Sequence, residues 1–154
     1  MDFDLNHDLS GGLQLCQIGD ERQVAAAFSL MHQLRPQLAN ADAFIAYWKR
    51  ASMQGYRLWS LQDDGDIVAL ASYRIQENIV HGLYLYIEDL VTDDAHRSCG
   101  YGQILMDKLK QQARFAGCQK IVLDTPLSNA LGQRFYFRQG LLASALRFNQ
   151  VLAA

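Results

Sequence analysis

The order of the expected elements predicts an α/β protein with a central mixed, mostly antiparallel sheet and helices on both of its faces. Three observations lead to this fold class. The spacing of apolar side chains changes along the chain between the period of a strand and the period of a helix. Three expected strands follow two helices with no helix between them, and the later strands alternate with helices. Parallel pairing is therefore expected only where a helix intervenes.

The first third of the chain combines one strand with two helices. Residues 13–18 alternate apolar and polar side chains, which is typical of a half-buried strand. Asp20 can cap a helix that Pro36 stops soon after its apolar face ends. Asn40 can cap a second helix, which carries aromatic residues at helical spacing.

The middle of the chain is expected to be a run of three strands. Residues 56–61 and 67–75 flank an Asp-Gly turn and predict a hairpin. Residues 83–92 are nearly all apolar, which indicates a central strand covered on both faces. Glu88 and Asp89 are the exceptions, and two acids in such a strand need a functional or a structural explanation.

The last third alternates helices and strands. A helix is expected to open near Gly102 and to close at Gly117, before a strand at residues 120–124. A last helix over residues 128–139 and a final strand over residues 141–148 complete the predicted fold.

Composition favours a single domain over residues 1–154, with a loose tail at residues 1–12. The formal net charge of -2 argues against a nucleic-acid partner, because phosphate binding needs many Lys and Arg side chains. No stretch approaches the roughly 20 apolar residues of a membrane span, and no basic region followed by an apolar run indicates export. We therefore expect a protein of the cytoplasm that does not associate with membranes.

The three cysteines are Cys16, Cys99 and Cys118. An odd number at wide spacing argues against a disulfide framework and favours a reducing compartment. Because they also lack metal-ligand spacing, no metal site is expected.

The loop before the third expected helix has the sequence Arg97-Ser98-Cys99-Gly100-Tyr101-Gly102. The first amides of a helix have no partners and carry partial positive charge, so a phosphate can bind there. The loop lacks the Lys-Ser/Thr ending of a nucleotide triphosphatase loop, and it lacks the third glycine of a dinucleotide fold, so ATP and NAD are weak candidates. The alternative interpretation is a tight turn with no ligand.

Placed after residues 90–96, this loop resembles the Arg-x-x-Gly-x-Gly acetyl-coenzyme A motif of the GNAT superfamily of N-acetyltransferases. Residues 129–141 resemble the late helix of that superfamily, in which an Asn precedes a Phe-Tyr pair and a Gly closes the helix. The element order is also similar over nearly the whole chain. Asp94, Ser98-Cys99 and Leu141 depart from the common pattern, but none of them removes a main-chain donor.

The resemblance implies a GNAT-like acyl-CoA N-acyltransferase fold with acetyl-coenzyme A (acetyl-CoA) as co-substrate. It implies that the main chain of Leu90 and Val91 aligns the pantetheine arm and that Asn129 steadies it from the late helix. It also implies Tyr136 as the general acid for the departing thiolate. The pyrophosphate would lie against the loop residues Arg97, Ser98, Cys99, Gly100, Tyr101 and Gly102.

An amine that attacks a thioester must first lose a proton, because alkyl amines are protonated at neutral pH. Glu88, beside the expected pantetheine site, is the candidate base, and direct transfer then needs no acyl-enzyme on a cysteine. The alternatives are that Glu88 is a structural acid and that Tyr136 is a packing residue.

The expected acceptor is a primary amine of a small molecule or a peptide. The alternative function is a non-catalytic acyl-CoA-binding module or regulatory subunit. Exposed strand edges would allow a homodimer.

Overall fold

Five strands form one sheet in chain order, β1-β2-β3-β4-β5. Each pair from β1 to β4 is antiparallel, and the predicted fold class, a mixed sheet with helices on both faces, is confirmed. The strands are β1 (Leu13–Gln17), β2 (Arg57–Asp63), β3 (Asp66–Asn78), β4 (Gly82–Thr92) and β5 (Lys120–Leu123).

The computed structural model describes residues 2–153, and the chain divides into two units, Met1–Val122 and Leu123–Ala154. The first unit contains β1 to β4, β5 up to Val122, and three α-helices. The second contains one helix and the C-terminal segment. The single domain expected over residues 1–154 stays a prediction.

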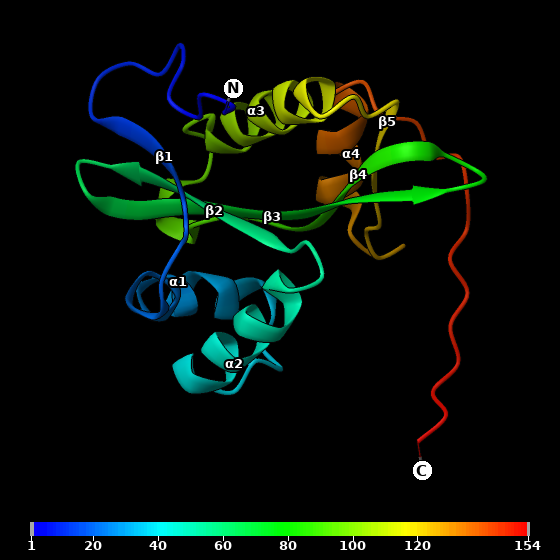
Figure 1. Cartoon of the computed structure of the whole chain (residues 1–154), viewed down its shortest axis with the longest axis horizontal. Coiled ribbons are helices and arrows are strands. Elements are labelled where there is room, and N and C mark those ends of the chain that lie inside the picture. Colours follow the sequence, from blue (N-terminus) through cyan, green and yellow to red (C-terminus); the bar gives the residue numbers. More distant parts are fainter. Residues whose placement is uncertain (1, 154) are drawn as a thin grey trace. The chain divides into compact units, whose positions relative to one another are not determined.

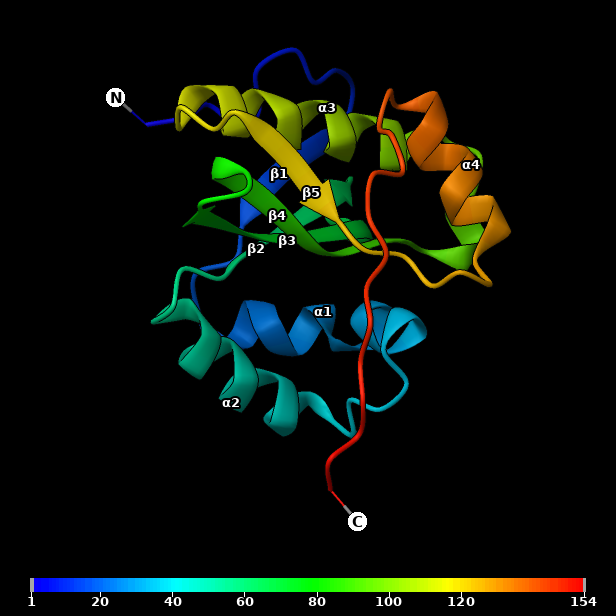
Figure 2. The same ribbon diagram turned by 90° about the vertical axis from the view of Figure 1, so that its right-hand side faces the viewer.

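Helices cover both faces of the sheet within the first unit. Helices α1 (Glu21–Leu34) and α2 (Ala41–Ser52) lie on one face, and α3 (Tyr101–Phe115) lies on the other (Figures 1 and 2). Both predicted caps are confirmed, since the side chains of Asp20 and Asn40 accept hydrogen bonds from main-chain amides of the first turns at 2.9 and 2.8 Å. A short 3-10 helix, η1 (Asp94–His96), connects β4 to the loop before α3.

The middle parts of β2 and β3, residues 58–61 and 68–73, are buried on both faces, as their long apolar runs require. Leu58 and Leu70 pack with Phe44 of α2 and Val24 of α1, and each of these side chains is at most 1% exposed. Burial of side chains of this size stabilises a fold by about 1.5–3 kcal/mol each. Packing in this core therefore holds α1 and α2 against one face of the sheet.

One register shift interrupts the pairing of β3 with β4. Ser72 is opposite Asp89, whereas Tyr73 is opposite Ile87, so Glu88 has no partner on β3. This arrangement is a β-bulge, in which an extra residue on one strand bends it and increases its twist. The bulge falls on one of the two acids that the sequence singled out.

The prediction of a final strand at residues 141–148 is wrong. In the described part of the chain, α4 (Ala130–Arg138) is followed only by irregular segments, and Leu142, Phe148 and Leu152 are exposed. Apolar side chains can make a segment suitable for a strand, but a strand also needs a neighbour to pair with, and no described strand pairs with these residues. Among residues 2–153, no helix has both the length and the apolar character needed to cross a bilayer.

Candidate active site

The bulge in β4 turns two consecutive acids toward the same face of the sheet. In a regular strand, neighbouring side chains point to opposite faces. Here Glu88 pairs with Arg74 and Asp89 accepts from Ser72, and these two partners lie two residues apart on β3. Because residues two apart on a strand share a face, both acids lie on the side that α1 and α2 cover.

The carboxylate of Glu88 is held by two side chains. Arg74 Nε lies 2.5 Å from its Oε1, and the hydroxyl of Tyr47 on α2 donates to its Oε2 at 3.2 Å. The guanidinium of Arg74 also donates to the Tyr47 oxygen at 3.3 Å, which closes a triangle of three contacts. The side chain of Glu88 remains 19% exposed, so its position is fixed while a small group can still reach it.

Tyr47 acts as a hydrogen-bond donor in this triangle. Burial raises the pKa of its phenol, and the nearby carboxylate of Glu88 raises it further. The hydroxyl therefore keeps its proton at neutral pH and donates it in the hydrogen bond to Glu88.

The carboxylate of Asp89 is fully engaged by neighbours. Arg35 Nε lies 2.7 Å from its Oδ1, and the Ser72 hydroxyl donates to its Oδ2 at 2.5 Å. The side chain of Asp89 is only 12% exposed. These contacts indicate a structural role for Asp89 and leave Glu88 as the acid with the more accessible side chain.

The C-terminal end of β4 has one main-chain edge that no described strand covers. Leu90 and Val91 pair with β3 through their other edge. The amide of Gln119, just before β5, donates to the carbonyl of Leu83 at 2.8 Å. Because β5 has four residues, a strand that starts there cannot reach Leu90. No described strand therefore pairs with the outer edge of β4 at Leu90 and Val91.

The loop before α3 leaves the first amides of that helix without a side-chain cap. Its N-cap residue, Gly100, has a φ of 81° and no side chain to accept from them. Ser98 also has a positive φ, 68°, so the chain turns sharply twice within three residues. Cys99 is exposed, and the exposed side chain of Arg97 pairs with Asp94 at 2.6 Å. An anion can therefore approach these amides from solvent.

Tyr101 has a different role from the other residues of this loop. Its side chain is buried, and its hydroxyl donates to Asp63 Oδ2 at 3.1 Å at the end of β2. Burial is the main cause that raises the pKa of this phenol. The side chain therefore anchors the start of α3 to the sheet, and only the main chain of Tyr101 is left for a ligand.

The second unit carries the other two expected site residues. The side chain of Asn129 caps α4, since its Oδ1 accepts from the amide of Gly132 at 3.1 Å and its Nδ2 donates to Thr125 at 3.0 Å. Tyr136 is half-buried on α4, where its ring contacts Phe135 edge to face. Both assigned roles stay predictions.

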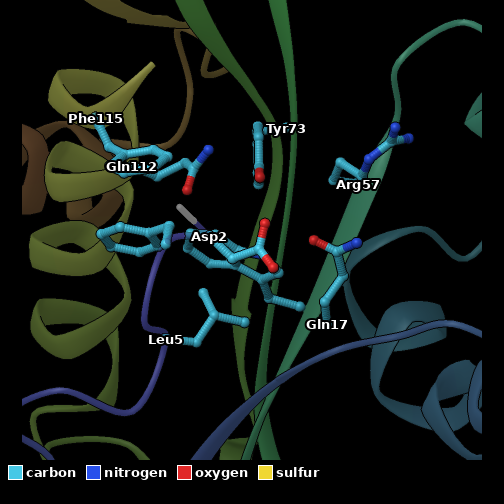
Figure 3. Close-up of a pocket in the computed structure, with 9 residues that line it drawn as sticks. Asp2, Leu5, Gln17, Arg57, Tyr73, Gln112 and Phe115 are labelled. Atoms are coloured by element: carbon cyan, nitrogen blue, oxygen red, sulfur yellow. The ribbon is translucent and has the colours of Figure 1, made fainter. Parts of the chain in front are cut away.

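A cavity of about 350 Å³ lies elsewhere in the first unit. Figure 3 shows Tyr73, Gln112, Phe115, Arg57 and Asp2 around it. Tyr73 is next to Arg74 on β3, so its side chain points to the opposite face of the sheet, the face that α3 covers. The cavity is therefore separate from the Glu88 site and contains none of the residues predicted for acetyl transfer.

Sequence reasoning did not assign roles to Arg74, Arg35 or Ser72. A usable signal for Arg74 was present, because it is a charged residue in a strand whose other residues from 67 to 75 are mostly apolar. Arg35 and Ser72 carry no comparable signal. Their partner Asp89 lies more than 15 positions away, and the contact depends on the bulge.

Comparison with known proteins places these features in a family. The model of the acetyltransferase (GNAT) family matches residues 24–141. The glucosamine 6-phosphate N-acetyltransferase of Trypanosoma brucei brucei is 31% identical over 130 residues, which cover 78% of this chain and 88% of the relative. An uncharacterized N-acetyltransferase of Bacillus subtilis is 29% identical over 124 residues, which cover 80% of this chain and 87% of the relative.

Solved structures show the same fold. An acetyltransferase of Trypanosoma brucei is 25% identical with a TM-score of 0.74, covering 91% of this chain and 99% of the other. An aminoglycoside N-acetyltransferase in complex with CoA is 17% identical with a TM-score of 0.80, covering 95% and 99%. The chain therefore belongs to the acetyltransferase (GNAT) family and is an N-acetyltransferase.

Proposed function

We propose that the chain binds acetyl-CoA along the free edge of β4 and the start of α3, and transfers the acetyl group directly to a primary amine. The observation that carries this proposal is the bulge, which sets the Glu88 carboxylate beside an uncovered stretch of main chain. Leu90 is two residues beyond Glu88, a separation of about 7 Å at the rise of a strand. A base and a binding edge are thus adjacent.

The residues present fit acetyl-CoA in two ways. The first amides of α3, which no side chain caps, suit a pyrophosphate, since a helix N-terminus favours negative charge. The free edge at Leu90 and Val91 suits the amide groups of a pantetheine arm, which can pair as a strand does. Acetyl-CoA would supply an acetyl thioester, in which the carbonyl carbon is the electrophile.

The amine must reach this carbonyl with a free lone pair. Glu88 takes the ammonium proton, directly or through one water, and the amine nitrogen then forms a bond to the carbonyl carbon. A main-chain N–H near Leu90 or Val91 stabilises the negative charge that develops on the carbonyl oxygen. The carbon–sulfur bond breaks, and Tyr136 gives its proton to the departing thiolate. The nitrogen loses its second proton as the amide forms, and this proton returns through solvent to the Tyr136 phenolate. No cysteine of the chain takes part.

The acceptor is proposed as a small-molecule amine. Three similar proteins have names that specify such acceptors, namely glucosamine 6-phosphate, aminoalkylphosphonates and aminoglycosides. The opening at Glu88 suits a compact amine, because the Glu88 side chain is only 19% exposed. The negative charge of the Glu88 carboxylate also attracts an amine, which carries a positive charge before it loses its proton.

A panel of amines with acetyl-CoA tests the proposed function. It should include an amino sugar, an amino sugar phosphate, an aminoalkylphosphonate, an aminoglycoside, a polyamine and a peptide with a free N-terminus. We expect at least one amine to release free thiol at a rate well above the hydrolysis rate without amine. Retention of the acetyl group on the protein as a thioester would contradict direct transfer.

We further propose that the protein acts in the cytoplasm. Its three cysteines are free, and Cys99 is exposed on the loop that would hold the pyrophosphate. Such a thiol is best preserved in a reducing compartment.

Gly100→Ala is expected to weaken acetyl-CoA binding by about 10-fold. An alanine at a φ of 81° is strained by about 1–2 kcal/mol, and relief of that strain would turn the first amides of α3 away from the pyrophosphate. Isothermal titration calorimetry with acetyl-CoA measures the change in Kd.

Gly117→Ala is the matched control for this variant. Gly117 follows the other end of α3 with a φ of 80°, and at both glycines an added Cβ would meet open space. Both variants should therefore lower the free energy of unfolding by a similar amount. Equal loss of acetyl-CoA affinity in both would show that the effect is only destabilisation.

A further inference from the structure

The guanidinium of Arg35 binds two successive residues of β4 at once. Its Nη2 donates to the main-chain carbonyl of Glu88 at 2.8 Å, and its Nε lies 2.7 Å from the carboxylate of Asp89. Arg35 itself is fixed at the end of α1, where its amide donates to the carbonyl of Met31 at 2.8 Å. One side chain thus connects the end of a helix to the bulge.

The bulge creates the need for such a contact. Glu88 has no partner on β3, so its carbonyl is not held by the regular pairing of that pair of strands. Arg35 supplies a donor to that oxygen from outside the sheet. A buried main-chain carbonyl that lacks a partner costs free energy, and the charged donor here makes a stronger bond than a neutral one.

Ser72 completes the arrangement from the other side. It is opposite Asp89 in the register, and its hydroxyl donates to the Asp89 oxygen that Arg35 does not bind. The carboxylate of Asp89 therefore joins β3, β4 and the end of α1. We call Arg35, Asp89 and Ser72 the bulge clamp.

We infer that Arg35 is a positioning residue for acetyl transfer, because it fixes the bulge from which the Glu88 side chain projects. This inference rests on the proposed function. The planar fork of an Arg side chain can bind two acceptors in a set geometry, and the contacts at Glu88 and Asp89 use it in that way. A displacement of about 1 Å in a reacting group can cost about 10²-fold in rate. Arg35 binds the main chain of Glu88 and leaves the carboxylate to Arg74 and Tyr47.

Arg35→Lys tests whether the planar guanidinium, and not only its positive charge, is needed at this position. A lysine keeps the positive charge beside Asp89, so this part-buried carboxylate keeps a cation, but a lysine has no planar fork to hold the Glu88 carbonyl as well. We expect Tm to stay close to that of the parent chain while kcat falls by about 10-fold. The Kd for acetyl-CoA should change by less than about twofold, because the start of α3 is not touched.

Arg35→Met with Asp89→Asn gives a second, independent test. Arg35→Met alone leaves the part-buried Asp89 carboxylate without its cation and should lower stability. The added Asp89→Asn change removes that charge, so stability should recover. The inference requires kcat to stay low in this double variant, because the Glu88 carbonyl still has no donor; a kcat restored together with stability would overturn it.

A double-mutant cycle with Glu88→Gln measures whether the two substitutions affect kcat independently. A purely structural role of Arg35 would give independent effects. If Arg35 acts through Glu88, Arg35→Lys should cost much less in kcat when Glu88 is already Gln. Additive losses in kcat would overturn the inference. Lys49→Met is the control, since Lys49 makes an exposed ion pair with Glu21 on the same layer of helices and should leave kcat and Tm unchanged.

The outcomes also distinguish this inference from the proposed function. If Glu88→Gln retains the parent rate, the assignment of Glu88 as the base fails. If Glu88→Gln is slow and Arg35→Lys is as fast as the parent chain, only the role of Arg35 fails.

Discussion

Glu88→Gln is expected to lower kcat at neutral pH by about 10²-fold or more, the range in which a positioned general base contributes. Glutamine has nearly the same shape and can keep the hydrogen bond from Tyr47, but its amide cannot take the ammonium proton. Steady-state rates of thiol release with the best amine of the panel measure this loss.

The pH dependence of the variant gives a second measurement. Without a base, only the free amine can react, and its fraction rises about tenfold per pH unit below the amine pKa of roughly 10.4. The rate of Glu88→Gln at subsaturating amine should therefore rise steeply with pH, whereas the parent chain should respond less. Equal slopes in the two proteins would count against a proton transfer to Glu88.

Glu77→Gln is the matched control for the loss of a carboxylate. Glu77 lies on β3, the strand that pairs with β4, and its side chain is exposed at the end of that strand. The substitution removes the same charge from the same sheet without touching Arg74 or Tyr47. Its rate should stay within about twofold of the parent chain, since an exposed charge at this distance from the site is screened by solvent.

The helices of the first unit could be predicted from the sequence because local chemistry determines where they start. Asp20 and Asn40 cap α1 and α2 as expected, and Gly100 precedes α3 with the positive φ that favours glycine. Each of these features depends on residues within one helical turn. A single sequence contains that information.

The bulge could not be predicted from the sequence. It depends on the register between β3 and β4, and a shift of one residue reverses which side chains face each helix layer. A regular strand would have sent Glu88 and Asp89 to opposite faces, and only one of them could then have met α1 and α2. The sequence indicated the importance of the two acids, but it could not indicate that they share a face.

The predicted final strand shows where a local pattern fails as a guide to structure. Residues 141–148 are mostly apolar and are predicted to form a strand, yet no described strand pairs with them. A helix satisfies its main-chain groups internally, whereas a strand needs another segment to do so. Local pattern is therefore a weaker guide at this end of the chain than at α1 or α2.

Tyr136→Phe is expected to lower kcat by about 10²-fold, the lower end of what a general acid contributes, because a thiolate leaves more readily than an alkoxide. The substitution removes one oxygen and keeps the ring, so the contact with Phe135 on α4 should survive. The Kd for acetyl-CoA, measured by calorimetry, should stay within about twofold, because the pyrophosphate and pantetheine contacts are assigned to other residues. A fall in kcat with unchanged Kd is the pattern of an interaction used only in the chemical step.

The rate loss in Tyr136→Phe should also depend on the leaving group. If the phenol protonates the departing thiolate, an acetyl thioester of a more acidic thiol needs less help, and the difference between variant and parent chain should shrink. Tyr84→Phe is the control, since it removes a phenol oxygen that bonds Gln76 and Asn78 near the end of the β3–β4 hairpin. A Tyr136→Phe variant as fast as Tyr84→Phe would exclude the general acid, and a loss that does not vary with the thiol would assign the phenol to packing or orientation, because proton donation is the one role that couples its effect to the basicity of the sulfur.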